Sequence, residues 1–147
     1  MENLAWEIAE TAHALRRAYD RRASALGVTR AQWRVLAWLA REPGLRQIAL
    51  ADKLDVEAIT LCRIIDRLEE AGLVERQRDP DDRRAWRLHL TPKAEPVVAG
   101  LRRLATELAE TAFAGLGEDG TEEMRASLKR IRSNLCAAMT HSKQVSA

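Results

Sequence analysis

Residues 45–90 hold two short helical patterns in close succession, followed by two strand-like segments. Apolar side chains recur every three or four positions in both helical patterns: Ile48, Ala51 and Leu54 in the first, and Leu61, Ile65 and Leu68 in the second. That spacing places each apolar set on one buried helix face. Because the chain must turn between the two within about three or four residues, the pattern predicts a helix-turn-helix unit.

The turn falls at Asp55, where many helix-turn-helix proteins have glycine. Aspartate tolerates the left-handed backbone conformation better than most residues do. We therefore expect Asp55 to end the first helix in that conformation, and the second helix to begin shortly after it.

The outer face of the second helix is the candidate contact surface. Burial of the apolar set turns five residues outward or to the flanks: Ala58, Ile59, Thr60, Arg63 and Arg67. Arginine can pair with both O6 and N7 of guanine, threonine can donate to a base or phosphate, and isoleucine can contact a thymine methyl. The pattern predicts a helix that enters the major groove of double-stranded DNA. The alternative is an ordinary amphipathic helix whose arginines are solvated.

A β-hairpin is expected after this helix. Apolar residues alternate in 73–77 and 86–90, and the segment between them is rich in aspartate, proline and arginine. The predicted second strand turns Trp86, Leu88 and Leu90 to one face and Arg87 and His89 to the other. An arginine at the tip could enter a narrow, A·T-rich minor groove. Together these segments predict a winged helix-turn-helix, with Arg83 and Arg87 as the DNA-binding residues of the wing.

The segments DRLEEAGLVER and DPDDRRAWRLHLT resemble the signature of MarR-type transcription regulators, and LTPKAEPVVAGL is similar to the branch typified by SlyA. In that family the first of two wing arginines reaches the minor groove, and the second pairs with an aspartate of the recognition helix. The resemblance therefore implies that Arg83 contacts DNA and that an Arg84–Asp66 ion pair locks the wing. Arg46 stands where many relatives have a serine or threonine cap.

Composition restricts the other possibilities. Hydrophobic residues make up 46% of the 147 residues, which is enough for a core, and no apolar run approaches the roughly 18 residues of a membrane span. Cys62 and Cys136 lie on separate predicted helices without metal-ligand spacing, so we expect reduced thiols in a cytoplasmic protein that needs no cofactor. No histidine lies at triad spacing and no glycine-rich phosphate loop occurs, which argues against an enzyme.

The predicted fold is mainly α with a small β-wing, in three regions. These are an N-terminal dimerisation helix (1–28), the winged helix-turn-helix (29–91) and C-terminal dimerisation helices (92–147). In the last helix, expected from about Thr121, a heptad-like seam runs through Met124, Leu128, Ile131, Leu135 and Ala138. Terminal helices that each need a partner predict a homodimer, and hence a palindromic operator. The alternative is a monomer whose terminal helices fold back on the winged region.

The resemblance also implies a repressor that small aromatic or phenolic ligands release from DNA. Four residues have the chemistry of such a pocket: Trp6, His13, Trp33 and Trp38. Each could equally belong to the core. Three further alternatives remain: a constitutive DNA-binding dimer, a thiol-based redox regulator using Cys62 in the recognition helix, and a protein-interaction module. The outward arginines argue against the last of these.

Overall fold

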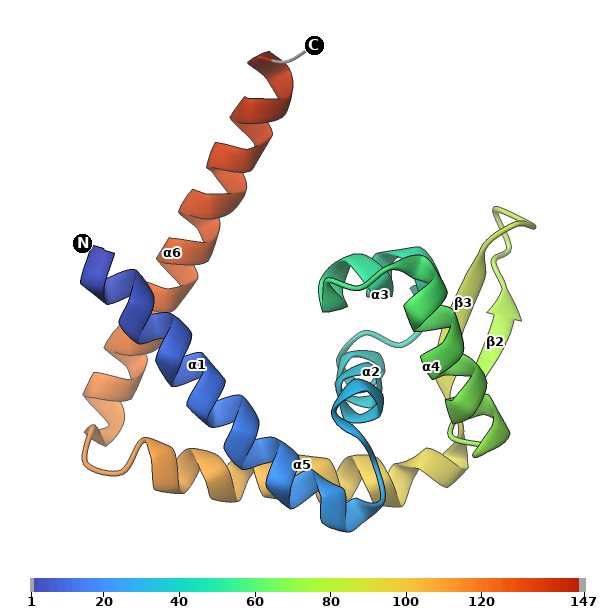
Figure 1. Ribbon diagram of the computed structural model, residues 1–147, viewed down its shortest axis with the longest axis horizontal. Coiled ribbons are helices and arrows are strands. Elements are labelled where there is room, and N and C mark those ends of the chain that lie inside the picture. The colour runs from blue at the N-terminus through green and yellow to red at the C-terminus, as the bar shows by residue number, and fades with distance from the viewer. Residues whose placement is uncertain (1, 146–147) are drawn as a thin grey trace. The chain divides into compact units, whose positions relative to one another are not determined.

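The computed structural model describes the backbone of residues 2–145 and the side chains of residues 3–138. The chain divides into two compact units, Met1–Leu108 and Ala109–Ala147, here called unit 1 and unit 2. Most of the described residues are helical, and three short strands form one antiparallel sheet (Figure 1). The expected fold class, mainly α with a small β-wing, is confirmed.

Two helices open unit 1. Helix α1 spans Glu2–Ala23 and continues as the 3-10 turn η1, Ser24–Leu26, which Gly27 ends at φ 74°. Helix α2, Arg30–Arg41, begins at the predicted capping box, in which Thr29 and Gln32 satisfy each other's backbone N–H groups. The Tyr19 hydroxyl then donates to the Leu101 carbonyl oxygen at 2.8 Å, which ties α1 to the helix that follows the wing.

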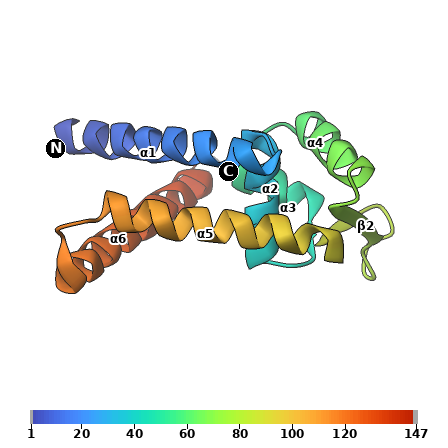
Figure 2. The ribbon, with the colours of Figure 1, turned by 90° about the horizontal axis from the view of Figure 1, so that it is seen from below.

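The helix-turn-helix is formed by α3, Gln47–Leu54, and α4, Ala58–Glu70. Asp55 joins them at φ 53° and ψ 53°, so the expected left-handed aspartate is confirmed. Leu61, Ile65 and Leu68 of α4 are fully buried, as their spacing predicts. Figure 2 shows α4 and β2 together at one end of unit 1, next to α2 and α3.

The sheet has the order β1-β3-β2, and it contains one strand more than the sequence predicts. Strand β2, Val74–Arg78, pairs with β3, Trp86–Leu90, to form the expected hairpin. Strand β1, Leu45–Arg46, pairs with the other edge of β3. A strand of two residues is too short for alternation to reveal it, and tertiary pairing alone defines it. Gly44 precedes it at φ 78°, and a Cβ there would approach the His89 ring to 3.1 Å.

The buried faces of α3 and α2 differ in part from the predicted ones. Ile48 is 69% exposed, and α3 instead buries Leu50 beside Ala51 and Leu54. In α2, the spacing of Trp33, Leu36, Ala37 and Ala40 predicts one buried face. The buried residues are instead Val35, Leu36 and Leu39, while Trp33, Ala37 and Ala40 are only partly buried. Because α2 is covered on several sides, its buried face is wider than a single amphipathic stripe.

Helix α5, Glu95–Ala112, follows the 3-10 turn η2, Pro92–Ala94. Thr91 precedes η2, but its hydroxyl donates to the Gly72 carbonyl oxygen at 2.5 Å instead of capping the helix. Pro96 therefore lies in the first turn of α5, where its missing N–H removes no intrahelical hydrogen bond.

Unit 2 consists of the end of α5 and helix α6, Gly117–Val145. Helix α6 begins earlier than Thr121, whose hydroxyl donates to the Gly117 carbonyl oxygen at 2.7 Å from within the helix. Glu118 and Asp119 in the first turn favour this start through the helix dipole. None of the described helices is long and apolar enough to cross a membrane.

Candidate nucleic-acid interface

The outer face of α4 presents the predicted contact residues to solvent. Ala58, Ile59, Thr60, Arg63 and Arg67 are all exposed, and Ile59 is 63% exposed. Their exposure follows from the burial of Leu61, Ile65 and Leu68, because residues on the opposite face of a helix point away from the core. A large exposed isoleucine beside arginines suits a surface that meets both base methyl groups and polar base edges. Contact of these five residues with DNA stays a prediction.

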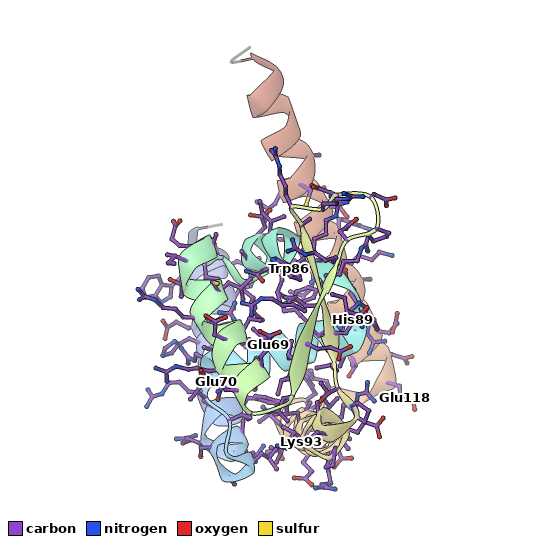
Figure 3. All side chains as sticks on the ribbon, turned by 90° about the vertical axis from the view of Figure 1, so that its right-hand side faces the viewer. Glu69, Glu70, Trp86, His89, Lys93 and Glu118 are labelled. Carbon is purple, nitrogen blue, oxygen red and sulfur yellow. The ribbon has the colours of Figure 1, made fainter. Side chains whose placement is uncertain are left out.

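Arg76 on β2 connects the wing to the helix-turn-helix. Its guanidinium forms ion pairs with Glu69 and, at 2.7 Å, with Asp66, and its Nε donates to the Gln47 side chain at 3.1 Å. The Arg76 side chain is only 14% exposed. Burial lowers the pKa of Arg76, but the carboxylates of Asp66 and Glu69 outweigh burial and raise it, so the guanidinium stays charged. Figure 3 shows Glu69 on the side of α4 that faces the strands, and Glu70 pointing away from them.

The predicted Arg84–Asp66 ion pair is wrong in this structure. Asp66 pairs with Arg76, which reaches it from the middle of β2, whereas Arg84 lies in the loop between the strands. The Arg84 side chain is exposed and has no ion pair or hydrogen bond to any described residue. The lock between wing and recognition helix is therefore present, but a different arginine supplies it.

The loop between β2 and β3 is held by aspartate side chains. Asp79 accepts from the Asp81 N–H, and Asp82 accepts from the Arg84 N–H, both at 2.9 Å. Such bonds stabilise a turn locally, because a carboxylate replaces a backbone acceptor. The Arg78 guanidinium lies 4.0 Å from the centre of the Trp86 ring.

Arg78 also donates to the Arg83 carbonyl oxygen at 2.7 Å. The loop backbone that carries Arg83 is therefore fixed, while the Arg83 side chain is exposed. An arginine presented on such a loop matches the predicted minor-groove contact, which itself stays a prediction.

Asp79 is a buried acid that sequence reasoning missed. Its side chain is fully buried, and its Oδ2 lies 2.7 Å from Arg46 Nε and 2.9 Å from Arg87 Nε. Burial by itself raises the pKa of Asp79, but the Asp81 N–H and the Arg46 guanidinium outweigh it and hold this pKa below its ordinary value. Arg46 and Arg87 are opposite each other on β1 and β3, so one carboxylate forms an ion pair with both.

This network adds a structural role to the DNA contact expected of Arg87, and that contact stays a prediction. Besides its ion pair with Asp79, the Arg87 guanidinium donates to the Gly44 carbonyl oxygen at 3.2 Å. The Arg87 side chain is 37% exposed. The guanidinium therefore connects three parts of the sheet, which gives Arg87 a structural role that the sequence did not suggest. The missing signal was β1, since without that strand neither Arg46 nor Gly44 is placed beside β3.

The structure does not gather the four predicted pocket residues into one cavity. Trp6 is 68% exposed and His13 is exposed. Trp33 packs against Tyr19 with ring centres 4.4 Å apart and donates to Asp20, and Trp38 lies under the Lys53 ammonium. The two cavities beside α2 and α5 are lined by other residues. Trp33 and Trp38 pack against the core, as the core alternative expects, whereas the exposed Trp6 and His13 do not.

The cysteines and acidic residues form no metal site within the described residues. No group of three or more histidine, cysteine, aspartate and glutamate side chains is placed to hold a metal ion there. Cys62 is a half-buried thiol whose Sγ lies 3.6 Å from Arg76 Nη2, and Cys136 is exposed; neither forms a disulfide among the described residues. A redox role for Cys62 stays a prediction.

Comparison with known proteins agrees with this geometry. The MarR family model matches residues 26–85. A MarR transcriptional regulator from Methanosarcina mazei Go1 is 28% identical, with a TM-score of 0.83 over 93% of this chain and 99% of that one. The transcriptional regulator PA3341 is 38% identical, with a TM-score of 0.82 over 90% and 97%.

A mutant of E. coli MarR complexed with operator DNA is 25% identical, with a TM-score of 0.74 over 88% of this chain and 93% of that one. That relative carries the same fold onto DNA. With the exposed face of α4, the ordered wing and the family match in agreement, the chain belongs to the MarR family of DNA-binding transcriptional regulators.

Proposed function

We propose that this regulator is a repressor that binds a palindromic operator as a homodimer and is released by a small aromatic ligand. The observation that carries the proposal is the fully exposed outer face of α4 next to a wing held in place by Arg76 and Asp79. A dimer with twofold symmetry presents two such faces, which match two half-sites one helical turn apart.

In this proposal each exposed residue has one task. Arg63 pairs with O6 and N7 of a guanine, Thr60 donates to a base or phosphate, and Ile59 contacts a thymine methyl. Ala58 and Arg67 border these contacts on α4. Arg83 enters the minor groove beside the half-site, where A·T-rich sequence narrows the groove and attracts arginine.

The proposed dimer interface uses the apolar faces of the terminal helices. Four residues of α6 are large, apolar and exposed at a spacing of four, three and four: Met124, Leu128, Ile131 and Leu135. Helix α1 exposes Leu4 and Ile8 as well. A contiguous apolar seam of this kind on a helix is stable in water only when another helix covers it.

The proposed ligand site is a cavity of about 330 Å³ between α1, α2 and α5, not the region around Trp6. Its walls are apolar except for the Tyr19 ring and two cations, Arg41 and Arg102. Ligand pockets of this size combine apolar walls with a few polar groups. An aromatic carboxylate fits this lining, since arginine pairs with carboxylate through two parallel hydrogen bonds.

We also infer that the chain lies in the branch typified by SlyA. The segment from Leu90 to Leu101 carries this inference, and Gly100 within it has a structural reason. A Cβ on Gly100 would lie 3.0 Å from two methyl carbons of Leu26, so a larger residue there would require the Leu26 side chain to shift.

Selection of bound fragments from the source genome tests the function. Wild-type protein should enrich fragments with a shared inverted repeat and bind them far more tightly than random duplex. Affinity for both should fall steeply as salt rises, because phosphate contacts release counterions. Enrichment of no common sequence would contradict an operator-reading role. A panel of aromatic acids that leaves operator affinity unchanged would contradict release by ligand and favour a constitutive regulator.

A further inference from the structure

Arg84 is the wing residue whose role the structure leaves open. Asp66, the partner expected for it, is taken by Arg76, and the exposed Arg84 guanidinium has no ion pair among the described residues. Its backbone is nonetheless fixed, because the Arg84 N–H donates to Asp82 at 2.9 Å. A free cation on an ordered loop is available to an anionic partner.

The Arg84 side chain lines a cleft of about 330 Å³ between the loop that joins β2 to β3 and the first residues of α3 and α4. The apolar walls of this cleft come from three elements: Ile48 of α3, Ala58 of α4, and Ala85 and Trp86 of the wing. Ile48 is 69% exposed, which is unusual for a large apolar residue beside a core. Figure 3 shows Trp86 and His89 on opposite faces of β3, with Trp86 on the side of α4.

The charges around the cleft favour an anion. Two arginines, Arg46 and Arg84, and one acid, Asp82, line it. Arg46 is already paired with Asp79, so Arg84 is the cation that is free to bind. Helices α3 and α4 both begin at this cleft, and neither N-cap residue bonds to the first-turn N–H groups through its side chain. Those N–H groups add partial positive charge.

The cleft is continuous with the proposed DNA surface. It is bordered by Ala58, directly before Ile59 on α4, and by Arg84, directly after Arg83 on the wing. A backbone strand separates the major from the minor groove in duplex DNA, so a module that enters both must pass that strand between its two contacts. The cleft lies between the elements proposed to make those two contacts.

We propose that this cleft holds the sugar and phosphate of the DNA strand between the two grooves, with Arg84 as the phosphate contact. The deoxyribose lies against Ile48 and Trp86, and the phosphate accepts from Arg84. Arg84 thereby changes from the wing lock implied by the family resemblance to a sequence-independent anchor, while Arg76 is the lock. This inference rests on the proposed DNA binding.

Arg84→Ala is compared with Arg103→Ala, which removes the same charge from an exposed position on α5. Because a dimer carries two Arg84 side chains, Arg84→Ala should reduce the salt slope of binding by about 1.8, the value for two lost phosphate contacts, and weaken binding about 30-fold near physiological salt. The loss should be equal on selected and random duplex. Arg84→Lys should keep the slope, and Arg103→Ala should change nothing.

Thermal unfolding without DNA separates the anchor from a lock. An anchor leaves the melting temperature of Arg84→Ala at the wild-type value. A lowered melting temperature, or an unchanged salt slope, overturns the inference while leaving DNA binding itself intact. Wild-type protein that binds no DNA would instead contradict the proposed function.

Neutral methylphosphonates placed one at a time in a selected fragment locate the contact. At one position per half-site, the methylphosphonate should weaken DNA binding by wild-type protein but should not weaken binding by Arg84→Ala any further. Equal sensitivity of both proteins at every position would also overturn the inference.

Discussion

Helices α4 and α6 carry apolar stripes of nearly the same spacing but bury them differently. Leu61, Ile65 and Leu68 of α4 are fully buried under α2, α3 and the strands. On α6, by contrast, Leu128 is 36% exposed and Leu135 is 60% exposed. Figure 1 shows α4 beside β2 and β3, which cover its inner face. Unit 1 therefore covers the stripe of α4, whereas the described residues of unit 2 leave the stripe of α6 exposed.

This difference separates two tasks that periodicity cannot distinguish. A stripe that is buried within its own chain fixes the opposite face of the helix, as α4 does for Arg63. A stripe that stays exposed has a free energy to gain from a second chain, at about 25 cal/mol for each Å² of apolar surface removed from water. The first arrangement presents the outer face of α4, and the second is suited to pairing two chains.

The largest expected effect is a loss of core packing in α4. Leu68→Ala should lower the free energy of unfolding by about 2–5 kcal/mol at any protein concentration, because it leaves a cavity. Leu128→Ala removes the same atoms from α6 but should cost less than about 0.5 kcal/mol in dilute protein. Urea unfolding at low and high protein concentration compares them. Equal costs at every concentration would mean that unit 2 buries Leu128 by itself.

The next effect concerns assembly. Leu128→Glu should raise the dimer dissociation constant on the order of 100-fold, because the seam would bury an unpaired charge. Sedimentation should show a monomer, and circular dichroism should show an unchanged helix content. Arg103→Glu, an exposed charge change on α5, is the control and should leave the dimer intact. A Leu128→Glu protein that sediments like wild type would exclude the α6 seam from the interface.

A smaller effect is expected at the reading surface. Arg63→Ala should weaken operator binding by about 1–3 kcal/mol and relax the preference at one base pair of each half-site. Binding to random duplex should change far less. Competition titrations with single-base operator variants measure this, and equal losses on both duplexes would make Arg63 a phosphate contact.

The smallest effect is a pH dependence from Asp79. Because its pKa in the folded protein lies below the ordinary value, the charged side chain stabilises the fold above about pH 4. That stability is lost as pH falls through the lower folded pKa. The difference in unfolding free energy between wild type and Asp79→Asn should therefore narrow in acid. Asp52→Asn, at an exposed position, should show no such convergence. A constant difference for Asp79→Asn would contradict the assignment.

Much of the winged region could be predicted, because its signals are local. The spacing of Leu61, Ile65 and Leu68, the left-handed Asp55 and the capping box at Thr29 each depend on residues close in the sequence. Exposure of Arg63 follows from the same period. The predictions were wrong where tertiary contacts determine which residues are buried. Ile48 fits the period of α3, yet it lines the cleft beside the loop between β2 and β3 instead of the core.

The ion pairs could not be predicted because each joins elements distant in the sequence. Arg76 and Asp66 are ten residues apart on different elements, and Asp79 meets Arg46 only through a strand of two residues. The sequence contains many arginines that could reach each acid, and composition does not choose among them. The family resemblance implied Arg84 as the partner of Asp66, but Arg76 forms the ion pair with Asp66.

In the proposed complex, two chains paired through unit 2 place two α4 helices on one operator, and the mass of the complex tests this arrangement most directly. Native mass spectrometry of wild-type protein on a selected fragment should give two 16.5 kDa chains per duplex. Leu128→Glu should give mainly one chain, bound more weakly. A complex of one wild-type chain per duplex, with the full affinity for the selected fragment, would contradict this arrangement.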